Sequence, residues 1–197
     1  MADEQRWNHN IHYHRMLLDA MPEPCTSALD VGCGEGVLAR RMRQSISQVT
    51  AIDVDPNSIE IARRRDPESR IDYRLGDFMT ASLEPASFDF VVCVAALHHM
   101  DEGLALRRMR ELVRPGGTLA VLGLARSRYP AELPRDATAL VVDRAHRLTG
   151  SRWESPAPTL APPPHTYREI RLPAERTLPG VRFRRQLLWR YSMTWTS

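Results

Sequence analysis

The order of apolar and amphipathic segments constrains the fold of this chain more than any other feature. Apolar runs of strand length alternate with helix-length periodic segments from residue 28 to residue 124. This alternation predicts parallel strands that are joined by crossover helices. We expect strands at 28–31, 49–52, 71–74, 88–95 and 118–124; the last two are near-continuous apolar runs, as in strands covered on both faces.

Polar and turn-forming residues mark where the helices between these strands begin and end. Asp55 is placed as an N-cap with Pro56 at the first helical position, and Asp101 is placed to cap a later helix. The segment 114–117, Arg-Pro-Gly-Gly, is expected to end that later helix and to turn the chain into the next strand.

The chain becomes rich in proline after Leu124. Nine of the 15 prolines lie between Pro130 and Pro179, so regular structure is interrupted there. Residues 137–148 can still form a helix, whereas 155–164 should run extended as a connector or lid. From 181 onward apolar and polar residues alternate, which predicts one or two half-buried strands with a bend near Leu188.

Composition narrows the class of protein and its location. No apolar stretch approaches the roughly 18 to 20 residues that span a bilayer, and the first 14 residues lack a secretory signal, so we expect a cytoplasmic protein without membrane partners. The three cysteines are an odd number in a chain too long to need disulfides, and they are expected to be small buried hydrophobes.

All 27 basic residues are arginines. Without lysine the chain cannot form a Schiff base, carry a Walker-type phosphate loop or use a lysine general base. The arginines cluster at 40–43, 63–65 and 107–110, each on a segment with helical periodicity. Solvated helix faces are the favoured interpretation, and a nucleic-acid surface is the alternative.

A glycine-rich loop, 30–36, connects the first predicted strand to the first predicted helix. Its glycines at alternate positions, Gly32, Gly34 and Gly36, let the backbone turn sharply and approach a ligand closely. With a strand before it and a helix after it, the loop indicates a nucleotide cofactor, and a turn that only packs strand against helix is the alternative.

The carboxylates around this loop indicate which nucleotide cofactor it would bind. Asp30 and Glu35 flank the loop, where a dinucleotide site would hold an anionic pyrophosphate, so a cofactor with cationic groups fits better. S-adenosylmethionine, with its ammonium and sulfonium, is the common one. Asp53 is placed to accept from the hydroxyls of a ribose, and Asp77 from an adenine amine with Phe78 beside the ring, because open α/β sheets bind ligands at the carboxyl ends of their strands.

Five segments in order, 28–36, 51–56, 76–78, 87–99 and 112–119, resemble the motifs of class I S-adenosylmethionine-dependent methyltransferases. In particular the chain is similar to the small bacterial enzymes of this class that act on metabolites. The resemblance implies a Rossmann-like, doubly wound α/β fold with seven strands, mostly parallel with an antiparallel last strand, in a single domain. It implies S-adenosylmethionine as cofactor, with S-adenosylhomocysteine as product, bound over the first two strands.

On this basis we divide the single domain into four parts. They are an N-terminal helix or lid (1–24), a cofactor-binding core (25–125), substrate-side helices with a Pro-rich connector (126–180), and C-terminal strands (181–197). In the family the segment before the first strand closes over the cofactor, which adds Tyr13 and His14 to the predicted cofactor set. That set is Asp30, Gly32, Cys33, Gly34, Asp53, Val54, Gly76, Asp77, Phe78, Val94, Tyr13 and His14.

Two groups of histidines are candidates for the chemistry. His98 and His99 follow the fourth predicted strand, where the resemblance places the transferred methyl, and a neutral imidazole is a suitable general base. A paired helix cap is the alternative. Near the N-terminus, Trp7, His9 and His12 are candidates for substrate binding on a roof helix, with a histidine-rich surface arm as the alternative.

Departures from related patterns narrow the acceptor. Val94 stands where magnesium-dependent catechol-type relatives carry a second aspartate, and the histidines near the N-terminus lack partners with zinc-like spacing, so no metal is expected. The segment 94–97 lacks the Asn/Asp-Pro-Pro-aromatic turn of enzymes that methylate bases, which favours a small-molecule acceptor and no nucleic acid. We expect a monomer or homodimer, and a non-catalytic cofactor-binding partner protein is the alternative to an enzyme.

Overall fold

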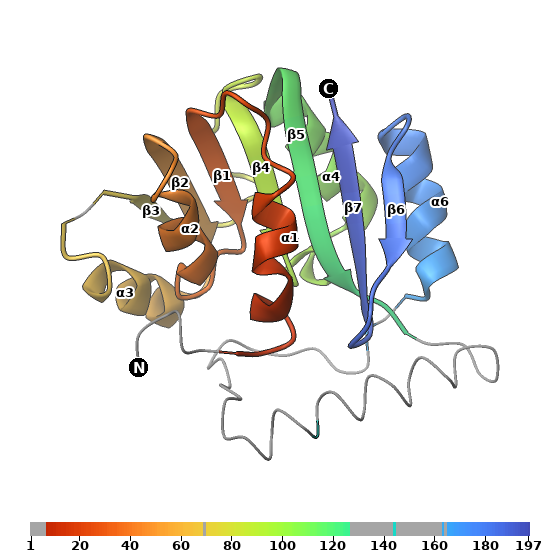
Figure 1. The fold of residues 1–197 in the computed structure, drawn as a ribbon, viewed down its shortest axis with the longest axis horizontal. Helices are drawn as coiled ribbons and strands as arrows, with labels where there is room; N and C mark the ends of the chain where they lie inside the picture. The colour runs from red at the N-terminus through yellow and green to blue at the C-terminus, as the bar shows by residue number, and fades with distance from the viewer. Residues whose placement is uncertain (1–6, 69, 127–143, 145–162, 164) are drawn as a thin grey trace.

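A computed structural model of the chain describes residues 7–68, 70–126, 144, 163 and 165–197. Its helices and strands follow one another in an order close to the predicted one (Figure 1). In chain order they are η2 (Ile11–Tyr13), α1 (His14–Leu18), β1 (Ser27–Val31), α2 (Val37–Met42), β2 (Gln48–Asp53), α3 (Pro56–Arg64), β3 (Asp72–Leu75), β4 (Phe88–Val94), η3 (Leu97–His99), α4 (Glu102–Leu112), β5 (Val113–Leu124), α6 (Tyr167–Thr177), β6 (Arg182–Arg185) and β7 (Arg190–Thr196).

The described strands form one seven-stranded sheet in the order β3-β2-β1-β4-β5-β7-β6. The pairs from β3 through to β5 are parallel, and β7 runs antiparallel to both of its neighbours. This confirms the predicted Rossmann-like sheet and its antiparallel last strand. The switch in strand order between β1 and β4 is the position at which such sheets bind ligands.

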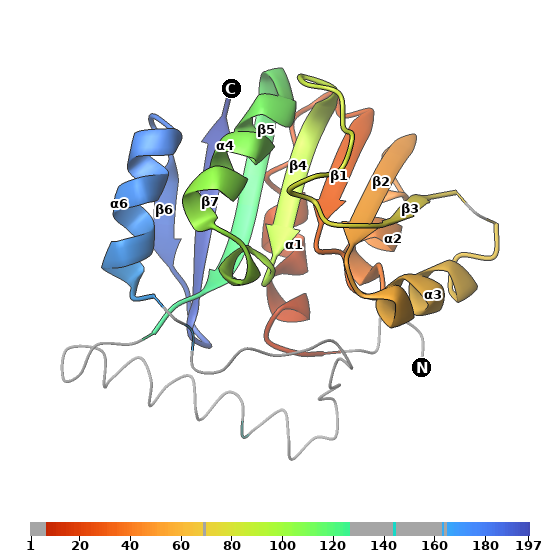
Figure 2. The ribbon, with the colours of Figure 1, turned by 180° about the vertical axis from the view of Figure 1, so that it is seen from behind.

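Helices cover both faces of the sheet. α1 and α2 lie in front of it in Figure 1, and α4 and α6 cover the opposite face, which is in front in Figure 2. Two separate hydrophobic cores result, one that includes residues of α1, α2 and α3 and another that includes residues of α4 and α6. Strands buried on both faces explain why their sequences are near-continuous apolar runs.

The two predicted helix caps are confirmed. The Asp55 carboxylate accepts hydrogen bonds from the backbone N–H groups of Asn57 and Ser58, and Asp101 accepts one from the N–H of Leu104 at 2.8 Å. The prediction for 114–117 was partly wrong. α4 ends at Leu112 as expected, but the Pro-Gly-Gly segment belongs to β5, which pairs with β4 at Val113 and again, after a register irregularity, at Thr118.

The bend near Leu188 is also confirmed. Leu188 and Trp189 both have positive φ, 56° and 55°, and separate β6 from β7. This bend breaks the predicted alternation, because Leu188 is fully buried whereas Leu187 is exposed. Arg190, expected on the polar face of a strand, is consequently buried.

Two further outcomes concern the rest of the chain. Cys93 is buried as predicted, but Cys25 and Cys33 are only partly buried. The helix predicted at 137–148 and the extended segment at 155–164 lie outside the described residues, apart from Arg144 and Pro163. Within the described part of the chain, no helix is both long and apolar enough to cross a membrane.

Candidate cofactor and acceptor site

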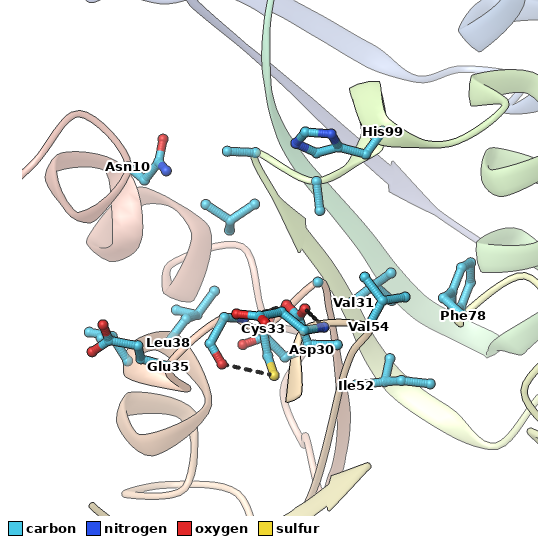
Figure 3. A pocket seen from close by; sticks show the side chains of 18 of the residues that line it. Asn10, Asp30, Val31, Cys33, Glu35, Leu38, Ile52, Val54, Phe78 and His99 are labelled. Carbon is cyan, nitrogen blue, oxygen red and sulfur yellow. Dashed lines mark hydrogen bonds between the residues drawn. The ribbon is translucent and has the colours of Figure 1, made fainter. Parts of the chain in front are cut away.

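A cavity of about 540 Å³ lies at the carboxyl ends of the parallel strands, below the N-terminal segment (Figure 3). It is lined by the glycine loop, by the ends of β1, β2 and β4, and by residues that follow β3 and β4. Of the predicted cofactor residues, all except Tyr13 line it, namely Asp30, Gly32, Cys33, Gly34, Asp53, Val54, Gly76, Asp77, Phe78, Val94 and His14, and both His98 and His99 line it too.

Two backbone hydrogen bonds join the glycine loop to the end of β2. The N–H groups of Gly32 and Cys33 donate to the carbonyl oxygen of Ile52 at 2.9 and 3.1 Å. Gly32 packs tightly, since a Cβ there would lie 2.2 Å from the Cβ of Ala96, whereas a Cβ on Gly34 would meet no atom within 4 Å. Both residues have positive φ. Gly32 therefore serves close packing, and Gly34 leaves open space at the cavity wall.

Asp53 links the loop to β2. Its Oδ2 accepts from the N–H of Gly34 at 2.7 Å, and its Oδ1 accepts from the N–H of Asp55 at 2.9 Å. An ionised carboxylate has about four acceptor positions, so each oxygen can accept one further hydrogen bond. The pair of hydroxyls on a ribose matches this remaining capacity.

Asp30 is the most deeply buried acid of the cavity. It is 2% exposed, and its Oδ2 has no hydrogen-bond partner among the described residues. Burial, reinforced by the nearby charge of Asp53, raises the pKa of Asp30 to about 7. A buried carboxyl without a partner is costly, and a cationic donor on a ligand would satisfy it.

Glu35, the second acid predicted to face a cationic cofactor, is already paired. Its buried carboxylate forms an ion pair with the guanidinium of Arg65. Glu35 lines the cavity, but its charge is balanced by Arg65, the C-cap residue of α3, which lies 30 residues away in sequence. That Glu35 faces the cationic cofactor therefore stays a prediction.

The acidic and aromatic residues after β3 lie at one side of the cavity. Asp77 uses Oδ1 to accept from the N–H of Met79 at 2.8 Å, which leaves Oδ2 for a ligand. Phe78 borders the cavity but is mostly buried in the core, with the Arg108 guanidinium carbon 5.4 Å from its ring centroid. The neighbouring Val54 is exposed and offers an apolar surface on the same cavity.

His98 and His99 lie together in η3, with ring centroids 4.1 Å apart. His98 is 9% exposed, and its Nδ1 has no hydrogen-bond partner within the described residues. Burial, then the neighbouring His99 and Arg190, lower the pKa of His98 to about 4. Its imidazole is therefore neutral at physiological pH and can accept a proton. His99 stands at the rim of the cavity (Figure 3).

The N-terminal segment presents a different face from the predicted one. It forms a short 3-10 turn followed by α1 instead of one helix, so Asn8, Asn10 and Ile11 join His14 in the cavity wall. Asn10 is directed toward the cavity in Figure 3.

The aromatic residues of this segment contact one another and the C-terminal bend. Tyr13 donates its hydroxyl to the carbonyl oxygen of Leu187 at 3.0 Å and is not among the residues that line the cavity, so its assignment to the cofactor set stays a prediction. Trp7 lies edge-on to His9 and His12, and His9 also lies near Trp189. None of Trp7, His9 and His12 lines the described cavity, and their assignment to substrate binding stays a prediction.

Sequence reasoning missed several residues of the cavity. Asn8, Asn10, Ile11 and Arg190 belong to it, and Arg190 gave no signal because it occupies a polar position of an alternating strand pattern. Among the described residues there is no group of three His, Cys, Asp or Glu side chains that could hold a metal ion.

Comparison with known proteins gives consistent matches. The family described as a methyltransferase domain matches residues 29–121. An uncharacterized methyltransferase of Mycobacterium tuberculosis is 41% identical over 193 residues, which cover 98% of each chain. A ubiquinone biosynthesis O-methyltransferase of Xanthomonas campestris is 41% identical over 108 residues, covering 53% of this chain and 45% of the relative.

A solved S-adenosylmethionine-dependent methyltransferase of Mesorhizobium loti has a similar structure. It superimposes with a TM-score of 0.52 at 26% identity, over 56% of this chain and 53% of its own. The matched region thus covers about half of this chain and about half of that protein and of the Xanthomonas enzyme.

Proposed function

Because this chain belongs to the class I S-adenosylmethionine-dependent methyltransferases, we propose that it methylates a small-molecule acceptor, without a metal ion, at the His98 end of the cavity. S-adenosylmethionine is the cofactor of this enzyme. The observation that carries the proposal is one cavity that holds both the cofactor carboxylates and a neutral, buried imidazole.

The residues present fit this cofactor. The free acceptor positions of Asp53 suit the ribose hydroxyls, and Asp77 with the apolar surface of Val54 suits the adenine. The unpartnered Oδ2 of Asp30 suits a cationic group of the amino-acid end. Bound S-adenosylmethionine supplies an electrophilic methyl group on its sulfonium.

The protein's own contribution is alignment, exclusion of water and removal of a proton. An in-line displacement gains most from holding the acceptor in the reactive orientation. His98 accepts a hydrogen bond from the acceptor O–H or N–H and takes up its proton as the methyl group is transferred. A base of pKa about 4 is ready to accept a proton but is weak, so we place its contribution near the lower end of the usual range, about 10²-fold. His99, 4.1 Å away between centroids, is the second candidate.

Several features support a small acceptor and a metal-free reaction. The whole cavity measures about 540 Å³ and must accommodate cofactor and acceptor together. Val94 lines it at the position where the metal-using relatives need a carboxylate. The Xanthomonas relative is named for an O-methyl transfer in ubiquinone biosynthesis.

We also propose that the protein acts in the cytoplasm as a monomer or homodimer, with no nucleic-acid or membrane partner. The arginine clusters support the nucleic-acid part of this proposal. Those of α2 and α3 lie on one side of the sheet and that of α4 on the other, so they do not form one continuous basic surface.

A search for methylated products tests the proposal. The protein is incubated with cell extract and S-adenosylmethionine carrying a trideuterated methyl group, and products that gain this label are sought by mass spectrometry. A labelled metabolite is expected with the wild type and with Asp72→Ala, an exposed acid of β3 outside the cavity. Its amount is expected to fall with Asp53→Ala when the cofactor is not saturating.

Two outcomes would contradict the proposal. Binding of S-adenosylhomocysteine without any labelled product would favour the alternative of a non-catalytic cofactor-binding protein. Label found only in nucleic acid or protein would contradict the small-molecule acceptor.

A further inference from the structure

Arg190, the first residue of β7, places a buried positive charge in the wall of the cavity. The residue is 8% exposed and follows directly on the positive-φ residues Leu188 and Trp189. The chain has no lysine, and Arg190 is the only arginine among the described residues that line this cavity. Burial lowers the pKa of Arg190 to about 10, which leaves it charged at neutral pH.

Within the described residues, the hydrogen bonds of Arg190 all go to neutral oxygens. Its Nε and Nη2 donate to Oδ1 of Asn10 at 3.0 and 2.9 Å, and its Nη1 donates to the carbonyl oxygen of Leu188 at 3.0 Å. A guanidinium carries five N–H groups, so one N–H on each terminal nitrogen remains for another acceptor. Two such N–H groups are what a carboxylate accepts in a bidentate pair.

No carboxylate within the described part of the chain forms an ion pair with Arg190. Burying a charge without a counter-ion is costly, so such an arrangement is typical of a site that a charged ligand completes. Asn10 holds the guanidinium in place without neutralising it.

The charges of the cavity are separated between its two ends. Asn10 and His99 lie at one end in Figure 3, whereas Asp30 and Cys33 of the glycine loop lie at the other. Arg190 belongs to the end that holds Asn10, and its charge contributes to lowering the pKa of His98. The acidic end suits the cationic cofactor, and the end with Arg190 is next to the proposed acceptor position.

We propose that Arg190 binds a carboxylate of the methyl acceptor, and that Asn10 positions its guanidinium for this contact. This inference rests on the proposed function, because it assigns the acceptor to the same cavity. A single positive charge with two available N–H groups matches a monoanionic carboxylate better than a phosphate dianion, which would need further cations. The acceptor is therefore a small carboxylic acid, and Arg190 determines the specificity for it.

Binding of matched acids and amides tests the inference. The protein is saturated with S-adenosylhomocysteine, and the affinities of acetate, butyrate and benzoate are compared with those of acetamide, butyramide and benzamide by calorimetry. We expect at least one acid to bind tenfold or more tightly than its amide, because hydrogen bonds between charged groups are the strong ones.

Two variants and one control assign this preference to Arg190. Arg190→Gln removes the charge, and Asn10→Asp neutralises it with a side chain of the same shape while Arg190 stays in place. Both should reduce the preference for the acid to less than about threefold, whereas Arg184→Gln, which removes an exposed charge from neighbouring β6, should leave it unchanged. If Arg190→Gln unfolds, Asn10→Asp still tests the proposal.

The failure of this inference differs from the failure of the proposed function. Equal binding of acids and amides by the wild type, or a preference that persists in Asn10→Asp and in any folded Arg190→Gln, overturns the role of Arg190 while S-adenosylhomocysteine binding and turnover remain. Loss of S-adenosylhomocysteine binding by the wild type would instead contradict the cofactor site itself.

Discussion

Replacing Asp53 by alanine should weaken cofactor binding and loosen the glycine loop at the same time. In the free protein each carboxylate oxygen already accepts one backbone N–H, at 2.7 and 2.9 Å, and keeps capacity for a ribose hydroxyl. Loss of hydrogen bonds to a charged acceptor costs about 1.5 to 3 kcal/mol of binding. This corresponds to roughly 10- to 150-fold weaker affinity for S-adenosylhomocysteine.

The same change removes the acceptor of the Gly34 and Asp55 N–H groups. At about 1 kcal/mol for each hydrogen bond, the free energy of unfolding should fall by roughly 1 to 2 kcal/mol. For a chain of this size that lowers the melting temperature by about 2 to 8 °C. Asp72→Ala, which removes an exposed acid paired with Arg74, is the matched control.

Calorimetry with two ligands separates contacts with the nucleoside part of the cofactor from contacts with its amino-acid end. Methylthioadenosine keeps the adenine and ribose of the cofactor but lacks its amino-acid end. Asp53→Ala should weaken both ligands by a similar factor, whereas Asp30→Asn should weaken only S-adenosylhomocysteine. Affinity of Asp53→Ala within twofold of the wild type for both ligands would refute the assignment, and so would an effect confined to S-adenosylhomocysteine.

Three further predictions concern the base, the loop and the metal. His98→Ala should lower turnover by about 10²-fold with S-adenosylhomocysteine affinity near wild type. Since the unprotonated imidazole is the active form and its pKa is about 4, the contribution of His98 to the rate is lost only as pH falls toward 4. A wild-type rate that rises between pH 6 and 7, with a flat profile in His98→Ala, would contradict this pH dependence. Gly34→Ala should still fold, but the positive φ at this position should lower its free energy of unfolding by about 1 to 2 kcal/mol. In calorimetry it should bind S-adenosylhomocysteine at least tenfold more weakly, because the added Cβ occupies space at the cavity wall. Unchanged affinity would show that the ligand does not pass close to Gly34. A chelator should leave turnover unchanged, as Val94 supplies no ligand, and a complete loss that magnesium reverses would show a metal site.

Local sequence was sufficient to locate the parallel strands and two helix caps, whereas the seven-stranded sheet with its antiparallel last strand was expected from the family resemblance. The apolar runs that became β1, β2, β4 and β5 were recognisable because strands covered on both faces need apolar residues on both sides. The caps Asp55 and Asp101 were recognisable because a cap bonds to N–H groups two or three residues away. The start of β5 was not recognisable from the sequence, since the Pro-Gly-Gly segment is typical of a turn and joins the strand only by pairing with β4.

The cofactor half of the site was predicted for a related reason. Asp30, Asp53 and Asp77 stand at or just after the ends of parallel strands, and parallel pairing brings those ends to one edge of the sheet. Their pairing with other side chains was not predictable from spacing. Glu35 looked equivalent to Asp30 beside the loop, yet Arg65, which caps the C-terminus of α3, neutralises Glu35, and no arginine pairs with Asp30 within the described residues.

By itself, then, the sequence determined the sheet, the glycine loop and the carboxylates of the cofactor, because each depends on residues close in the chain or on strand ends that the topology aligns. Only the tertiary structure decided which residues form the acceptor end. Asn10 and Arg190 are hydrogen-bonded although they lie 180 residues apart in sequence, and Tyr13 and Leu187 although they lie 174 apart. Neither contact therefore leaves a local sequence pattern. A buried arginine and an exposed one look alike in sequence, and only packing around the bend at Leu188 makes Arg190 part of the cavity.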